Sequence, residues 1–117
     1  MDLFTFTHFE DPVVKGRPRF SKWGAYTPKK TLDAEKRLRE TAIEAGIPKF
    51  EVPVEMSLIF YTKTKRRSDA SNLAKLVEDA LNNVAYSDDY LIESLHVRVF
   101  RALSGEVPRS EVMIKEL

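Results

Sequence analysis

The sequence predicts an α+β domain, of α/β type, in which a small mixed β-sheet packs against two main helices. Residues 54–62 alternate apolar and polar side chains as a buried strand does, and residues 71–84 repeat apolar side chains at helical spacing. The expected order of elements is β, loop, α, β, α, β, β, which describes a mixed sheet covered by helices. At 117 residues, the whole chain (1–117) is expected to form a single domain with a core that needs no disulfides.

In the first half of the chain, alternation over Leu3 to Phe9 predicts a strand. The basic stretch that follows, to about Pro28, is punctuated by Gly and Pro and predicts a loop or irregular hairpin. Thr31 is suited to cap a helix that runs to about Ala45 and ends at Gly46. The apolar side of this helix is expected to hold Leu32, Leu38, Ala42 and Ile43.

The second half begins with a strand at Val54 to Thr62, whose inward face is expected to consist of Val54, Met56, Leu58 and Phe60. A helix is expected over about Ser71 to Val84, because apolar residues recur there at i, i+3, i+4 and i+7: Leu73, Leu76, Val77, Ala80, Leu81 and Val84. Leu91 to Arg101 alternates as a strand with one face formed by Leu95, Val97 and Val99. Glu111 to Lys115 is expected to be the last strand.

Composition excludes several kinds of site. The chain has no cysteine, which excludes disulfides, thiolate zinc sites and cysteine nucleophiles and fits a reducing compartment. No apolar run approaches 18 residues, and the N-terminus lacks the pattern of a signal peptide. We therefore expect a soluble protein that is not exported and stays in the cytoplasm.

The charges are segregated along the chain although the net charge is only +1. Residues 12–32 hold no acidic side chain and six basic ones: Lys15, Arg17, Arg19, Lys22, Lys29 and Lys30. Residues 63–67 add Lys63, Lys65, Arg66 and Arg67, whereas residues 69–93 hold six acidic side chains and one basic side chain, Lys75. This distribution suits a protein that attracts phosphates broadly and binds a cation locally. Solvated charged faces are the alternative interpretation.

The acidic segment contains the candidate site. Asn72, Lys75 and Asp79 share one flank of the predicted helix, at i, i+3 and i+7. Asp69 precedes this helix, where a carboxylate can also serve as an ordinary N-cap. Asp88 and Asp89 lie in the turn before the next strand, where such residues are also common for local reasons. Whether the two ends of the helix meet in space depends on the sheet topology, which spacing alone does not determine.

The segments DASNLAK (69–75), EDALN (78–82) and SDD (87–89) resemble the signature of the RusA family of Holliday junction resolvases, approximately D-x-D-N-L-x-K, D-A-L and D-D. The segments KGRPRF (15–20) and AYTPKKT (25–31) resemble a phage and prophage branch of that family. The resemblance implies a homodimeric enzyme of recombination and repair that cuts four-way DNA junctions with Mg²⁺, for which Mn²⁺ could substitute. It implies no membrane partner and no small-molecule cofactor, and it implies the cytoplasm of a bacterium or of a phage-infected cell as the location.

The resemblance also implies roles for individual residues. Asp69, Asp88 and Asp89 would be metal-binding or catalytic carboxylates, and Lys75 would be the essential lysine that neutralises charge on the phosphate. Asn72 and Asp79 would support them. Ser71 stands where the family usually has a second aspartate, and a hydroxyl is a weaker magnesium ligand because it brings no charge. One unit-charge attraction at 4 Å is on the order of 4 kcal/mol at an effective dielectric of 20, before desolvation.

The basic residues are candidates for DNA contact. Lys15, Arg17, Arg19, Lys29 and Lys30 are interleaved with Phe20 and Tyr26, as in a surface that binds DNA backbone near unstacked bases. Arg66 and Arg67, next to Asp69, would hold a phosphate beside the metal. Trp23 could stack on a base or anchor a dimer. The alternative is a folded hairpin with core aromatics and solubilising lysines.

Three functions therefore stay open from the sequence. The first is a magnesium-dependent junction resolvase. The second is a junction-binding protein with weak or no nuclease activity, in which Ser71 has removed a needed ligand. The third is a broader nuclease acting on flaps or forks.

Overall fold

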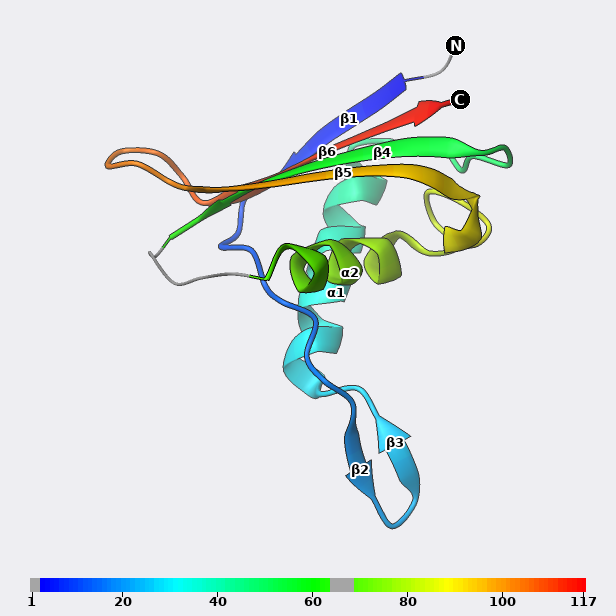
Figure 1. Cartoon of the computed structure of the whole chain (residues 1–117), viewed down its shortest axis with the longest axis vertical. Helices are drawn as coiled ribbons and strands as arrows, with labels where there is room; N and C mark the ends of the chain where they lie inside the picture. Colours follow the sequence, from blue (N-terminus) through cyan, green and yellow to red (C-terminus); the bar gives the residue numbers. More distant parts are fainter. Residues whose placement is uncertain (1–2, 64–68) are drawn as a thin grey trace.

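The computed structural model describes residues 3–63 and 69–117 and confirms the α+β class. Figure 1 shows a sheet seen nearly edge-on, with two helices on one side of it and a small hairpin projecting beyond the helices. The elements are β1 (Leu3–His8), β2 (Arg19–Ser21), β3 (Gly24–Tyr26), α1 (Lys29–Glu44), β4 (Val54–Thr62), α2 (Ala70–Leu81), the 3-10 turn η1 (Asp89–Leu91), β5 (Ile92–Arg101) and β6 (Arg109–Glu116). No helix in the described part of the chain is long and apolar enough to span a membrane.

The main sheet has the strand order β1-β6-β4-β5. β6 runs antiparallel to both β1 and β4, whereas β4 and β5 are parallel. Parallel neighbours need a crossover connection, and α2 supplies it. The helix therefore runs from the carboxyl end of β4 back toward the start of β5, which fixes the two ends of the candidate site.

The core lies between the sheet and the helices. As predicted, β4 points Val54, Met56, Leu58 and Phe60 inward, each no more than 1% exposed. The predicted apolar stripe of α2 meets them, because Leu73, Leu76, Val77, Ala80 and Leu81 are all buried. In β5, Leu95, Val97 and Val99 are paired with Met56, Leu58 and Phe60 and so share their face. Leu95 is still 40% exposed, which fits its position on the edge strand.

Two details of α1 differ from the sequence prediction. The helix starts at Lys29 with Pro28 as its N-cap, and Thr31 lies buried in its first turn. Leu32 and Ile43, predicted to be apolar contacts, are 50% and 57% exposed. At 100° per residue, both lie more than 100° around the helix from Leu38. The face that packs instead consists of Thr31, Ala34, Glu35, Leu38 and Ala42.

The predicted ends of the helices were correct for α1 and wrong for α2. Gly46 terminates α1 with a positive φ of 84°. The second helix stops at Leu81, three residues before the predicted Val84, because Asn82 is extended and Asn83 has a left-handed φ of 66°. This turn returns the chain to the core, where Tyr86 is fully buried and donates a hydrogen bond to the carbonyl of Glu78 at 2.7 Å.

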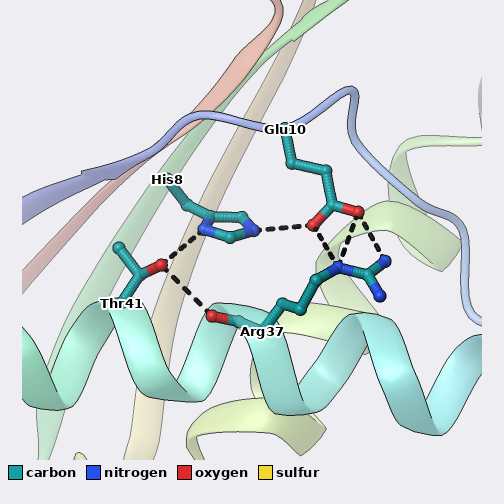
Figure 2. A network of polar contacts seen from close by, with 4 residues as sticks. All are labelled: His8, Glu10, Arg37 and Thr41. Atoms are coloured by element: carbon teal, nitrogen blue, oxygen red, sulfur yellow. Dashed lines mark hydrogen bonds and ion pairs between the residues drawn. The ribbon is translucent and has the colours of Figure 1, made fainter.

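Residues 9–18 form a strap that leaves β1 and runs along the helices to the hairpin (Figure 1). Figure 2 shows how its start is fixed to α1. The His8 ring places Nδ1 2.7 Å from the Thr41 hydroxyl and Nε2 2.8 Å from the Glu10 carboxylate. The Arg37 guanidinium donates to both oxygens of Glu10, at 2.6 to 3.2 Å. One carboxylate thus joins the strap, the end of β1 and the first helix.

This network should make the free energy of unfolding depend on pH. Burial disfavours the charged form of Glu10, but hydrogen bonds from Arg37 and His8 outweigh it and lower the pKa of Glu10 below 4.5. A carboxyl group whose pKa is lower in the folded state stabilises the fold at pH values above its unfolded-state pKa. That stabilisation is lost as the pH falls through the folded-state pKa.

We expect Glu10→Gln to reduce the free energy of unfolding by roughly 1 kcal/mol at pH 7 and by progressively less as the pH falls through the lowered folded-state pKa, because the carboxylate then becomes protonated in the folded state as well. Urea unfolding over this pH range would measure it. Glu44→Gln, at an exposed position of α1, is the control and should leave the profile unchanged. An effect of Glu10→Gln that stays equally large as the pH falls would contradict this prediction.

Candidate active site

The first part of the site is the start of α2, where Asp69 caps the helix. Its Oδ1 accepts the Ser71 backbone N–H at 2.9 Å, and its Oδ2 accepts from the Asn72 side-chain amide at 3.0 Å. The N-cap role that the sequence allowed for Asp69 is therefore confirmed. The Asn72 amide thus holds this carboxylate, and its supporting role in the site stays a prediction.

The second part is a line of alternating charges along the flank of α2. The Lys75 amino group lies 3.3 Å from Asp79 Oδ1 and 3.8 Å from Asp89 Oδ2. The other oxygen of Asp79 lies 3.0 Å from the Lys15 amino group, which also donates to Glu35 Oε2 at 2.7 Å. We call these five residues, which alternate in sign, the charge chain: Glu35, Lys15, Asp79, Lys75 and Asp89. It joins α1, the strap, α2 and η1.

The strap is held at this point by its backbone as well. The Lys15 N–H donates to the Asn72 carbonyl at 2.9 Å, and the Gly16 N–H donates to the Thr31 hydroxyl at 3.1 Å. A Cβ on Gly16 would lie 2.6 Å from that hydroxyl, so the close approach requires glycine at this position. The strap is thus bound to both helices directly beside the charge chain.

The electrostatics favour the charged form of both lysines. Burial opposes the charge of Lys75, but its hydrogen bond to Asp79 and the charges of Asp79, Asp89 and Glu78 raise its pKa. Burial likewise opposes the charge of Lys15, and its hydrogen bonds to Glu35 and Asp79 raise its pKa. Burial also raises the pKa of Glu78, with a smaller contribution from the nearby carboxylates.

Sheet topology separates Asp69 from Asp88 and Asp89. Because α2 is the crossover between parallel strands, Asp69 stands at its start and the other two aspartates follow its end. Asp88 accepts the backbone N–H of Asp89 at 2.7 Å, so the local turn role that the sequence allowed is confirmed. Among residues 3–63 and 69–117, no three Asp, Glu or His side chains gather into a group that could hold a metal ion.

The candidate DNA-binding residues differ in their surroundings. Arg17 and Arg19, with Lys29 and Lys30, are exposed around the hairpin, as a phosphate-binding role requires. Lys15 is placed differently from the free cation that we expected, because its amino group is paired with two carboxylates. Arg66 and Arg67 lie outside the described residues.

The main residue that the sequence analysis missed is Glu35. With Thr31, Ala34, Leu38 and Ala42 it completes the i, i+3, i+4, i+7, i+11 spacing of one helical face, so the periodicity of α1 could have placed it inside. A buried carboxylate needs a cation or several hydrogen bonds. That requirement could have directed attention to a basic partner, although nothing in the sequence identifies Lys15, 20 residues away, as that partner.

Comparison with known proteins gives the site its context. The family model described as Endodeoxyribonuclease RusA matches residues 10–115, a range that contains the whole charge chain. The chain is also similar to a protein of Bacillus subtilis (strain 168) with the name "Uncharacterized protein YqaN". The two are 32% identical over 143 aligned residues, which cover 100% of this chain and 99% of the relative. The resemblance found in the sequence is therefore confirmed, and it implies endonuclease activity on Holliday junctions: the chain belongs to the RusA family of endodeoxyribonucleases.

Proposed function

We propose that this protein is a magnesium-dependent endonuclease that resolves four-way DNA junctions by paired, symmetric hydrolysis of phosphodiester bonds. The observation that supports it best is the position of Lys75. Its amino group lies 3.3 Å from Asp79 and 3.8 Å from Asp89, within the segments that carry the family signature. A cation between carboxylates at the surface of a DNA-cutting domain suits the binding of a phosphate.

Lys75 is suited to stabilise charge rather than to move protons. A general base works best when its pKa lies near the operating pH, whereas the pKa of Lys75 is raised above 10.5. The side chain therefore stays cationic at neutral pH. A fixed positive charge aimed at the scissile phosphate would offset the negative charge that develops there in the transition state.

Magnesium would be held by carboxylates of the predicted set, either Asp69 with Ser71 as a weaker ligand at the start of α2, or Asp88 and Asp89 after its end, because the two ends lie apart. The described carboxylates do not form a three-carboxylate group on their own. Magnesium usually binds proteins through one or two carboxylates, waters and substrate phosphate, so we propose that it binds together with the DNA. When bound, it would polarise the scissile phosphate and lower the pKa of the attacking water.

The charge chain would hold Lys75 in place. Asp79 bonds Lys75 through one oxygen and Lys15 through the other. Lys15 is in turn fixed by Glu35, which is 5% exposed and so needs its cation. We propose that Lys15 and Glu35 orient Asp79 and thereby Lys75, without touching the substrate themselves.

Symmetric resolution also favours a homodimer. Two cuts in strands of like polarity need two sites, and a two-fold dimer supplies both at once. The second candidate function is junction binding with little cleavage, which Ser71 favours because this position brings no charge toward a metal ion.

We expect Asp89→Asn to slow cleavage of a synthetic four-way junction roughly 100-fold or more, because it removes a carboxylate beside Lys75. We expect Ser71→Asp to lower the half-saturating magnesium concentration about tenfold, by adding one attractive charge. Both would be measured with end-labelled junctions over a magnesium titration, and paired nicks would be mapped on each strand. Glu93→Gln, at an exposed position, is the control. Tight junction binding without nicks in the unmodified chain, with or without rescue by Ser71→Asp, would favour the second function.

We expect Lys15→Met to reduce the free energy of unfolding by about 2 kcal/mol, because it leaves the buried Glu35 carboxylate without its partner. Adding Glu35→Gln should recover most of this stability but not the cleavage rate, because Asp79 would still lack its second partner. Urea unfolding and single-turnover cleavage would separate the two effects. Lys36→Met, at an exposed position of α1, is the control. Full recovery of cleavage in the double variant would show that Lys15 matters for stability alone.

A further inference from the structure

The hairpin formed by β2 and β3 exposes an unusual amount of aromatic surface. Phe20 is 82% exposed, Trp23 86% and Tyr26 51%. The two strands pair with each other and with no other strand in the described residues, and Figure 1 shows the hairpin projecting beyond the helix layer. So many large apolar side chains left exposed on one short element mark that element as an interaction site. The alternative interpretation of the sequence, that these aromatics belong to the core, is therefore wrong.

The turn of the hairpin presents Trp23 at its tip. Ser21 pairs with Gly24, which leaves Lys22 and Trp23 as the two connecting residues. The Ser21 hydroxyl accepts the Trp23 backbone N–H at 3.1 Å, and Gly24 has a φ of 112°, which favours glycine. The Lys22 amino group lies 5.0 Å from the centre of the indole ring. A flat aromatic side chain and a cation thus stand together at the outermost point of the hairpin.

Charge indicates the kind of partner. Residues 12–32 carry six basic side chains and no acidic one. Of these, Arg17, Arg19, Lys29 and Lys30 are exposed at the base and along the strands of the hairpin. Such a surface attracts a polyanion. A second copy of this chain would have to bring a matching acidic surface to the same place, and its net charge of +1 supplies no general excess.

The aromatic side chains indicate which part of a nucleic acid is bound. Contacts to the phosphates of an intact duplex use basic and hydroxyl groups and need no aromatic rings. Exposed aromatic side chains stack on bases that are already unpaired, or enter between base steps that open easily. The centre of a four-way junction offers such bases beside closely spaced phosphates.

We propose that the β2–β3 hairpin is a binding element for unpaired bases at the branch point, with Trp23 as the stacking residue and the surrounding cations on the adjacent phosphates. This proposal rests on the proposed function only in taking branched DNA as the substrate. The base of the hairpin is fixed beside the charge chain, because the Lys15 N–H bonds to α2 and the Gly16 N–H bonds to α1. Stacking at the tip would therefore set the position of the DNA relative to Lys75.

The experiment uses the full chain, in which Trp23 is the single tryptophan and thus a specific fluorescent probe. A synthetic four-way junction, a duplex of the same base composition and a single strand would be titrated in EDTA, so that no cleavage occurs. We expect strong quenching of tryptophan fluorescence by the junction and the single strand and weak quenching by the duplex. With affinities measured from the fluorescence anisotropy of end-labelled DNA, Trp23→Ala should weaken junction binding about 5- to 150-fold and leave duplex binding within about twofold.

Two variants make the assignment specific. Leu103→Ala removes a side chain that is 70% exposed outside the hairpin and should change neither affinity. Arg19→Ala should weaken binding of all three DNAs and reduce the salt dependence by about one phosphate contact. Because Trp23 is exposed, its replacement should leave the circular dichroism spectrum and the unfolding midpoint unchanged.

The proposal would be overturned if Trp23→Ala weakened junction and duplex binding equally, or neither. It would also be overturned if the indole were already shielded from acrylamide without DNA, in a species whose mass rises with concentration, because a second copy would then cover the hairpin. Quenching by the junction without any cleavage in magnesium would contradict the nuclease and leave this proposal standing. Normal cleavage without quenching would support the nuclease and overturn the stacking role of Trp23.

Discussion

The position of Lys15 is the constraint on which the rest of the site depends. Its amino group lies between a carboxylate of α1 and a carboxylate of α2, at 2.7 and 3.0 Å, while its backbone N–H bonds to α2. The partner on α1, Glu35, is almost fully buried and would be costly to leave unpaired. The two helices, the strap and the base of the hairpin are therefore fixed to one another at a single point. The first turn of α1 contributes to the same point through the contact between Gly16 and Thr31.

Local periodicity explains which parts of the fold could be predicted from the sequence. The buried faces of β4 and α2 were predicted correctly because each element has one apolar face that repeats along its length, so only one orientation buries it. The packing face of α1 was predicted wrongly because Leu32 and Ile43 are apolar but lie off the stripe, whereas Glu35 is charged and lies on it. At these positions the polarity of the residue and its place around the helix give opposite predictions, and the place around the helix determines which side chains are buried.

The candidate site shows a different limit. The contact between Lys75 and Asp79 is an i, i+4 pair and follows from helix geometry alone. The approach of Asp89 to Lys75 depends on the length of the turn after α2. The helix ends three residues earlier than the apolar pattern predicted, so this turn is longer than expected. The pairing of Lys15 with Glu35 joins residues 20 positions apart and depends on the path of the strap. Contacts of this kind need the tertiary structure, because no local pattern specifies them.

The two lysines of the charge chain differ in how readily they could exchange partners. Lys15 is 21% exposed and makes two short ion pairs, one of them with a buried carboxylate. Lys75 is 50% exposed, and its contacts at 3.3 and 3.8 Å are longer. An exposed pair at such distances is worth on the order of 1 kcal/mol or less, so an incoming phosphate could displace Asp89 from Lys75 at small cost. Displacing both partners of Lys15 would leave a buried charge behind. The charge chain therefore contains two different lysines. Lys15 holds the helices and the strap together, whereas Lys75 can change partners and bind DNA.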